Sequence, residues 1–434
     1  MIVSVSVFAA TVVLMICGIL FFPEIRLGRL KISSFWVITL AGAIALLIFG
    51  GADITEVWEA LVADTAVNPV KILVLFISMT VLSVFLDELG LFRFLANAAL
   101  KRAKSGQKTL FLYLYLTVSV LTVFTSNDVI ILSFTPFICY FAKHAKIDPI
   151  PYLAAEFVAA NTWSMALIIG NPTNIYLATA CGLNFVDYLK LSILPTLFAG
   201  SVSFFCLYLL FRKKLSSPLS GEAEAVVLED KFLLWVGIIH LAVCTVMLAI
   251  SSYIGLPMWL ISLCAAASLF VISGITYAAR RKKPIHVFNC FKRAPWQLVP
   301  FVLSMFVMIA VLGQKGVTAS LGSLLGTDLS VLKYGVASFL ASNVINNIPM
   351  SVLFAAVIEG AEGGVDAVFA TVIGSNLGAC FTPLGALAGI MFGSILSNQH
   401  IKFGYVHFLK VGVAVAIPAL LAALGGLWLS LAFA

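Results

Sequence analysis

The chain has 434 residues, of which 62% are apolar and only 10% are charged, and its mean hydropathy is +1.11. A water-soluble domain carries roughly a quarter charged residues and about half apolar ones. The composition therefore excludes an ordinary soluble protein, a disordered chain and a nucleic-acid-binding protein. It indicates a polytopic membrane protein.

The apolar segments, taken in chain order, predict ten membrane spans, because crossing a bilayer takes about 20 apolar residues. The predicted spans cover residues 2–22, 34–50, 71–89, 151–180, 189–211, 232–250, 256–279, 296–313, 367–396 and 406–433. Since no basic segment precedes the first of them, we interpret it as a retained span and not as a cleaved signal.

Two further apolar stretches, 109–142 and 333–357, do not fit as double crossings. The first has 34 residues between Lys108 and Lys143, fewer than the roughly 40 that two spans require. Both ends of this stretch are basic. We interpret each stretch as a re-entrant hairpin, which enters the membrane and leaves it by the same side.

The lysines and arginines test this layout, because the cytoplasmic loops of membrane proteins are enriched in both. When the N-terminus is placed outside, 22 of the 26 basic residues fall on the cytoplasmic side. Only Lys71, Lys190, Lys315 and Lys333 fall outside. The sequence therefore predicts a multi-pass protein of the plasma (inner) membrane with extracytoplasmic N- and C-termini.

The layout also divides the chain into two halves of one plan: three spans, a hairpin and two more spans. The halves cover residues 1–212 and 232–434, and a cytoplasmic linker at 213–231 joins them. Five crossings is an odd number, so the second half must be inserted upside down. The predicted fold class is an all-α polytopic membrane protein with two inverted repeats, each holding a re-entrant hairpin and a broken helix. Many secondary transporters share this plan.

Four polar clusters interrupt the apolar runs, one in each hairpin and one in the span after it. Such breaks place free backbone groups near the membrane centre, where they can bind a solute or an ion. The alternative is that these residues only cap or kink helices, but such breaks have no reason to recur in both halves. The candidate binding residues are Thr125, Ser126, Asn127, Asp128; Gly170, Asn171, Thr173, Asn174; Ser342, Asn343, Asn346, Asn347; and Ser375, Asn376, Thr382, Gly385.

Asp128 is the most informative single residue. It lies 20 residues after Lys108 and 15 before Lys143, deep within its hairpin. A carboxylate inside a membrane is costly and marks an ion or proton path, so Asp128 is the candidate proton-coupling residue. An aspartate can also cap a helix, and the two roles are compatible.

Other acidic and histidine residues are less telling. Glu156 lies near the predicted cytoplasmic end of its span, and a functional role and a snorkelling structural role both stay open. Asp87, Glu88 and Asp187 fall at predicted span ends, where we expect them to be solvated. His240 is interpreted as a packed residue.

The sequence offers no support for an enzyme. It contains no phosphate-binding loop, no zinc-protease motif and no nucleophile elbow, so we expect no catalytic residues, metal or cofactor. Transport would be driven by an ion gradient or by a separate ATPase. None of the eight cysteines forms a C-x-x-C pair, and we expect Cys139, Cys181 and Cys380 to be dispensable.

The four clusters resemble those of the ion transporter superfamily over essentially the whole chain. That group includes divalent-anion/sodium symporters, sodium/proton antiporters and arsenite/antimonite efflux permeases. The segment from Thr125 to Leu132 and the string Asn346 to Pro349 are similar to the permeases of the ArsB type, whereas Cys380 has no place in that pattern. The resemblance implies efflux of arsenite or antimonite in exchange for protons, with Asp128 as the proton carrier.

Two alternative functions stay open, namely a sodium/proton antiporter and a sodium-coupled symporter of di- or tricarboxylates. The carboxylate symporters typically carry Ser-Asn-Thr in both hairpins, whereas here Asp128 and Val344 occupy the third position. A fixed negative charge beside the site would oppose a dianion, and a neutral hydroxylated solute would not meet that penalty. A membrane enzyme or receptor is the least favoured reading. The expected partners are a small solute or ion, the lipid bilayer and protons or sodium, with a partner ATPase or a homodimer left open and nucleic acid excluded.

Overall fold

The computed structural model describes residues 1–27, 30–64, 68–102, 106–216, 228, 230–401 and 403–433. Most of the predicted linker at 213–231 lies outside these residues, as do Arg29, Lys104 and Lys402 of the charge analysis. The described chain is almost entirely helical, which confirms the predicted all-α class, whereas the two inverted repeats stay a prediction. One small antiparallel pair of strands, which pairs Glu24 with Ser33, is the exception.

The first half of the chain forms ten α-helices and two short 3-10 helices. Two of its long apolar segments are interrupted, one between α6 and α7 and one between α8 and α9. The elements are α1 (Ile2–Phe21), β1 (Glu24–Leu27), β2 (Leu30–Ser33), α2 (Ser34–Phe49), α3 (Ile54–Val62), α4 (Pro69–Glu88), α5 (Leu91–Arg102), α6 (Gln107–Phe124), α7 (Asn127–Ala145), α8 (Ile150–Trp163), η1 (Ser164–Ala166), η2 (Ile168–Gly170), α9 (Pro172–Ala180) and α10 (Phe185–Phe211).

The second half also has two interrupted segments, one between α17 and α18 and one between α19 and α20. A 3-10 turn, η3 (Lys214–Ser216), comes first. The helices that follow are α11 (Lys231–Ala249), α12 (Ser251–Ile254), α13 (Met258–Ala279), α14 (Ile285–Arg293), α15 (Leu298–Gln314), α16 (Val317–Leu325), α17 (Ser330–Ile345), α18 (Asn347–Gly360), α19 (Val365–Gly378), α20 (Leu387–Asn398) and α21 (Tyr405–Phe433).

Eight helical segments of the described chain are long and apolar enough to cross a membrane. Three of the ten predicted spans are not among them. The segment 34–50 forms a helix of 16 residues. The segment 151–180 is divided by the 3-10 helices η1 and η2, and the segment 367–396 by a non-helical turn between α19 and α20. Conversely, α6 of the first hairpin reaches the length of a span with its 18 residues. The interruptions fall in the spans 151–180 and 367–396, where a broken helix is expected in each half, and the count of ten spans stays a prediction.

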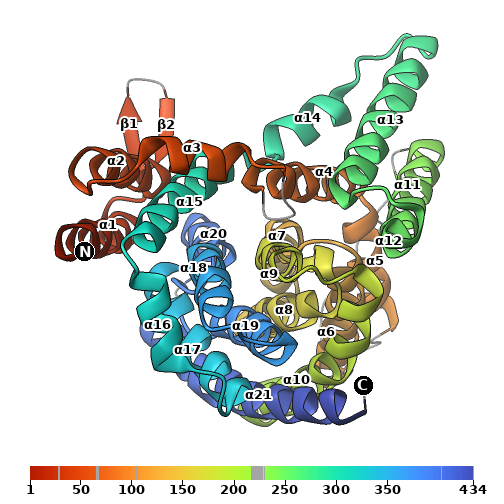
Figure 1. Ribbon diagram of the computed structural model, residues 1–434. Helices are drawn as coiled ribbons and strands as arrows, with labels where there is room; N and C mark the ends of the chain where they lie inside the picture. The colour runs from red at the N-terminus through yellow and green to blue at the C-terminus, as the bar shows by residue number, and fades with distance from the viewer. Residues whose placement is uncertain are drawn as a thin grey trace.

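Helix contacts follow one pattern in the two halves. The helix α2 packs on α15 and α4 packs on α13, while α6 packs on α8 just as α17 packs on α19. Across the halves, α7 contacts α20, α9 contacts α18, and α10 runs along α21. In Figure 1 the interrupted helices α7 to α9 and α18 to α20 occupy the middle, with α1 and α2 on one side and α11 to α13 on the other. Each broken helix of one half therefore meets the hairpin of the other.

Burial follows the same division. The middle helices α8, α9, α18 and α19 are buried along most of their length, whereas α11 and α13 carry many exposed apolar side chains. Exposed apolar side chains on outer helices are suited to lipid, and irregular backbone in a membrane survives only where protein surrounds it. The breaks are thus placed where their free backbone groups can find partners inside the protein.

Candidate functional site

The tip of the first hairpin is the two-residue break between α6 and α7. The Thr125 hydroxyl donates back to the Leu121 carbonyl of its own helix at 2.8 Å. The amide of Asn127 donates to the side-chain oxygen of Asn161 on α8 at 3.1 Å, and the Ser126 hydroxyl lies 3.5 Å from Asn127 Oδ1. The hairpin tip is therefore fastened to α8 through a pair of asparagines.

Asp128 is the second residue of α7 and lies in its first turn. Its side chain is partly exposed, and within the described residues it makes no hydrogen bond and no ion pair. The helix begins after Ser126, and no side chain caps it, so the capping role considered for Asp128 is wrong. The positive end of the helix dipole still favours a negative charge at this position, which leaves the carboxylate available to a proton or a solute.

The break in the following span is locked to the other half of the chain. Asn376 of α19 accepts hydrogen bonds from the Ser164 hydroxyl at 2.9 Å and from the Asn171 amide at 3.1 Å. It donates to Asn174 Oδ1 at 2.7 Å, and Asn174 in turn donates to the Ser164 carbonyl at 2.8 Å. All four residues are buried. The three asparagines of this central network satisfy one another, so they hold the broken helix in place.

The remaining residues of this cluster support the same turn. The Asn171 side chain caps α9 by accepting from the backbone N–H of Thr173 at 3.2 Å. The Thr173 hydroxyl lies 3.4 Å from Asn174 Oδ1. A side chain on Gly170 would overlap the Ser164 carbonyl, so the close approach of two backbones requires glycine there.

The second hairpin is fastened to the second break. The Asn347 backbone N–H donates to the Gly385 carbonyl at 3.0 Å, and the Asn346 amide donates to the Leu384 carbonyl at 3.1 Å. The Thr382 hydroxyl donates to Asn343 Oδ1 at 2.6 Å. The hairpin tip and the turn from Thr382 to Gly385 therefore form one unit. Between described residues, no hydrogen bond joins the two hairpin tips to each other.

The Ser-Asn pairs of the two hairpins, Ser126–Asn127 and Ser342–Asn343, do not occupy equivalent places in their helices. Ser126 and Asn127 lie where α7 begins. Ser342 and Asn343 belong to the last turn of α17, and the break follows at Asn346, which adopts a positive φ of 70°. The Ser342 hydroxyl donates within its helix, to the Phe339 carbonyl at 2.9 Å.

The cluster from Gly374 to Gly378 is not a break either. It lies inside α19, and the non-helical turn comes after it. Side chains on these two glycines would overlap the hydroxyls of Ser338 and Ser342 on α17. Glycines four residues apart allow two membrane helices to approach closely, and this packing explains them. Ser375, between them, is buried, and its hydroxyl has no hydrogen-bond partner among the described residues.

Two residues that matter here were missed or misread in the sequence. Asn161 lies 215 positions before Asn376. The side-chain amide of each donates to the backbone carbonyl four residues earlier in its own helix, Asn161 to Phe157 at 2.9 Å and Asn376 to Val372 at 2.8 Å. The repeat spacing was the signal that could have found it. Glu156 is fully buried, at 0% exposure. The snorkelling role considered for it is therefore wrong, because the neighbouring helices cover what was taken as the end of its span.

Asp87 and Glu88 are not solvated as expected. The Arg293 guanidinium lies 2.7 Å from Asp87 Oδ2 and 2.5 Å from Glu88 Oε1, and Asp87 is only 7% exposed. Arg293 comes from the second half of the chain, so the local sequence gave no sign of the pairing. Asp187 is half exposed beside Lys190, as expected for a solvated residue.

His240 bonds within its own helix, and the cysteines form no disulfides. The ring of His240 lies 2.7 Å from the Val236 carbonyl one turn earlier, as expected for a packed residue. All eight cysteines are free thiols, and Cys139 and Cys380 are buried. Within the described ranges, no group of three or more His, Cys, Asp or Glu side chains could hold a metal ion.

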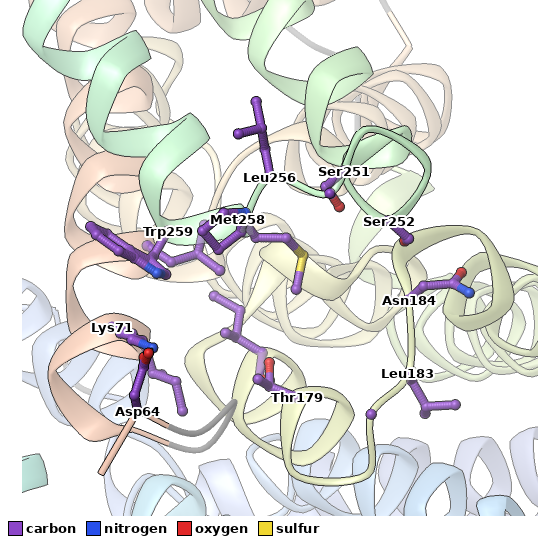
Figure 2. Close-up of a pocket in the computed structure, with 16 residues that line it drawn as sticks. Asp64, Lys71, Thr179, Leu183, Asn184, Ser251, Ser252, Leu256, Met258 and Trp259 are labelled. Atoms are coloured by element: carbon purple, nitrogen blue, oxygen red, sulfur yellow. The ribbon is translucent and has the colours of Figure 1, made fainter. Parts of the chain in front are cut away.

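Two cavities approach the middle of the molecule from opposite ends of α4. The first, of about 480 Å³, lies beside the start of α4 and the end of α9. Figure 2 shows Asp64 and Lys71 together on one wall, Thr179 and Asn184 on another, and Met258 projecting between them. The Lys71 ammonium, through a hydrogen bond and charge attraction, lowers the pKa of the exposed Asp64 carboxyl.

The second cavity is larger, about 860 Å³, and lies at the other end of α4, against one face of α7. Polar and charged side chains reach it from α4, α5, α7, α14 and the end of α20. They include Asp87, Arg93, Asn97, Ser133, Tyr140, His144, Arg293 and Gln399. Leu132 and Ser133 are the lining residues of α7 nearest to Asp128 in the chain, about one turn of helix after it. The first cavity thus lies beside the later part of α9 and the second beside the middle of α7, each on the helix that follows a polar cluster.

Comparison with known proteins gives matches over nearly the whole chain. The family described as "CitMHS: Citrate transporter" matches residues 12–374. An arsenical pump membrane protein of Escherichia coli (strain K12) is 27% identical over 418 residues, covering 92% of this chain and 94% of that protein. The protein of the same name from Yersinia enterocolitica is 26% identical over 423 residues, with the same two coverages. The crystal structure of the Alcanivorax borkumensis YdaH transporter superposes with a TM-score of 0.56 at 15% identity, covering 100% of this chain and 98% of that one.

Proposed function

Since the chain belongs to the citrate transporter (CitMHS) family and is a membrane transport protein, we propose that it is a secondary transporter that exports arsenite or antimonite in exchange for protons. Two of the relatives matched over nearly their full length are named arsenical pump membrane proteins. The chain is accordingly a multi-pass protein of the inner membrane, and both of its termini are placed outside in this proposal.

Asp128 carries the proposal. Its carboxylate lies at the tip of a hairpin, at the start of α7, and the protein provides no cation to neutralise it within the described residues. A proton can neutralise it instead, and an unpaired acid in a membrane is a common proton carrier. Arsenous and antimonous acid are neutral hydroxylated solutes, so they can share a site with this group without repulsion.

The two halves act as inverted repeats in this proposal. The matching helix contacts, α2 with α15 and α4 with α13, support a two-fold relation between them. The hairpins and breaks would then present the binding residues from opposite sides of the membrane. The residues left to contact the solute are those whose side chains are not fully used in holding the breaks, above all Asp128, Ser126 and Ser375.

The test is uptake of antimonite or arsenite by everted membrane vesicles from a host that lacks its own metalloid transporters. A proton gradient, acidic inside, should drive accumulation by the wild type. Asp128→Asn should abolish the proton-driven part, because an amide cannot bind and release a proton in this range. Asp328→Asn, an exposed aspartate before α17, is the matched control and should transport normally. Equal uptake by wild type and Asp128→Asn would remove Asp128 from the coupling.

A sodium-coupled carboxylate symporter is the second candidate. The family description names citrate, and the larger cavity carries Arg93 and His144, which can attract an anion. Sodium-dependent uptake of citrate or succinate in proteoliposomes, without metalloid transport, would favour this function over the first.

A further inference from the structure

A second carboxyl group lies on the same helix interface as Asp128. Glu156 of α8 is fully buried, and both of its oxygens are close to the Thr135 hydroxyl of α7, at 2.9 and 3.0 Å. Thr135 is itself fully buried. Within the described residues, this hydroxyl is the hydrogen-bond partner of the Glu156 side chain, and no ion pair neutralises the carboxyl group.

The Thr135 hydroxyl is directed to Glu156 and not to its own helix. Buried or half-buried threonines of α6 donate to the carbonyl four residues earlier, as Thr117 and Thr122 do at 2.7 Å. Thr135 makes no such bond in the described structure and contacts both carboxyl oxygens almost equally. A hydroxyl in that position can donate to a carboxylate, and it can also accept from or donate to a carboxylic acid. The contact therefore serves both protonation states of Glu156.

Thr135 and Asp128 lie on one face of α7. They are seven residues apart, which is close to two helical turns and about 10 Å along the axis. On the same interface with α8, Asn127 pairs with Asn161. The interface between α7 and α8 therefore holds two polar contacts, Asn127 with Asn161 at the hairpin tip and Thr135 with Glu156 further along, among mostly apolar side chains.

The opposite side of α7 faces the larger cavity. Ser133 lines that cavity at 9% exposure, and its hydroxyl has no hydrogen-bond partner among the described residues. Pro136, one turn from Leu132, has no N–H to donate to the Leu132 carbonyl. The Leu132 carbonyl therefore lacks the amide partner of a regular helix, and the Ser133 hydroxyl is buried and unpaired among the described residues. Both residues line the cavity and lie within three positions of Thr135 on α7.

The other charged groups near α7 and α8 are directed elsewhere. Cys139 lies one turn after Thr135 on α7 and is a buried free thiol. On the helices packed against α8, the charged side chains are exposed or already bonded: Lys108 is exposed on α6, Asp187 pairs with Lys190 on α10, and Asp366 of α19 accepts from Ser330. Around α7, Arg93 of α5 lines the cavity, and Asp87 and Glu88 of α4 pair with Arg293. The remaining charged residues of α5 and α7 are exposed, namely Lys101, Arg102, Lys143 and His144.

We propose that Glu156, held by Thr135, is a second proton-binding site of the transport cycle, loaded from the water of the larger cavity and coupled to Asp128 along the α7–α8 interface. This inference rests on the proposed proton-coupled function. Two carboxyl groups two turns apart in an apolar region disfavour simultaneous ionisation, because like charges repel more strongly at low dielectric. Protonation of one therefore depends on the state of the other, and each cycle moves two protons.

The experiment compares Glu156→Gln with wild type, because glutamine has the shape of the neutral acid but cannot release a proton. Everted vesicles are supplied with antimonite, and initial uptake is measured against pH at a fixed potential. The slope of log rate against pH should fall from about 2 in wild type to about 1 in the variant, as proton linkage requires. Thr135→Val should lower proton-driven uptake at least several-fold, whereas Thr117→Val and the exposed Glu59→Gln should match wild type.

A second measurement does not depend on substrate. Infrared difference spectra of the reconstituted protein at two pH values should contain a carboxylic C=O band that Glu156→Gln removes and Glu59→Gln keeps. A wild-type pH slope in Glu156→Gln, or a band that does not change with pH, would overturn the second proton site. If antimonite uptake by wild type proved independent of protons, the proposed function would fail, and the infrared band would still decide whether Glu156 titrates.

Discussion

Asn376 offers the sharpest test of how the two halves are held together. Its side chain makes four hydrogen bonds, three of which reach Ser164, Asn171 and Asn174 of the first half. Replacing it by alanine removes all three and leaves the Asn171 amide buried without its partner, whereas the Ser164 hydroxyl keeps the Asn161 carbonyl and Asn174 Oδ1 keeps the Thr173 hydroxyl. We therefore expect Asn376→Ala to destabilise the protein even where the fold survives.

The size of the effect follows from these contacts. Hydrogen bonds between helices in a membrane protein contribute about 0.6 kcal/mol each on average, and about 1.7 kcal/mol at most. The three bonds to the first half therefore predict a loss of about 2–5 kcal/mol in the free energy of unfolding. The adjacent Ser375 is the matched control, because its buried hydroxyl has no partner in the described structure. Ser375→Ala should change stability by less than about 0.5 kcal/mol.

The assay is unfolding of both variants and wild type in one detergent, followed by thermal scan and by chemical denaturation, with antimonite uptake measured in parallel. Asn376→Ala should lose stability, and its transport should fall with the amount of folded protein. Ser375→Ala should keep its stability, and a loss of transport there would identify Ser375 as a contact for the solute. If both variants were equally stable, the interpretation of the central network as a structural clasp would be refuted.

Three further predictions concern packing, charge and orientation. Gly374→Ala should destabilise the protein by about 1–3 kcal/mol, because the added methyl group has no room against α17. Gly393→Ala is the control: no atom lies within 4 Å of its new methyl group, so it should be neutral or slightly stabilising in the same thermal scan. Arg293→Gln should cost about 3 kcal/mol, since it leaves the carboxylate of Asp87 buried without its cation; an unchanged unfolding midpoint would contradict the pairing. In a variant without native cysteines, Lys283→Cys should react with a membrane-impermeant maleimide from the cytoplasmic side alone, and labelling from outside would reverse the proposed orientation.

The position of each hairpin could be predicted from the sequence, and the reason is local. Long apolar runs interrupted by Asn, Ser and Pro are visible residue by residue, and the breaks at Thr125 and Asn346 fall inside the two predicted hairpins. The register within the second hairpin could not be predicted, because Ser342 and Asn343 are compatible with a helix end as well as with a break. The same ambiguity concealed the role of Gly374, which packs against α17.

The sequence by itself determined that this chain is a helical membrane protein and which of its apolar segments are interrupted, since hydropathy and helix breaking act over a few residues. Its assignment of Asp128 to proton coupling stays a prediction. Only the tertiary structure decided which polar groups face one another. Asn376 meets three residues more than 200 positions away, and Arg293 covers Asp87 from a distant helix. Glu156 is buried because neighbouring helices close over it, and burial of that kind depends on packing that no local pattern records.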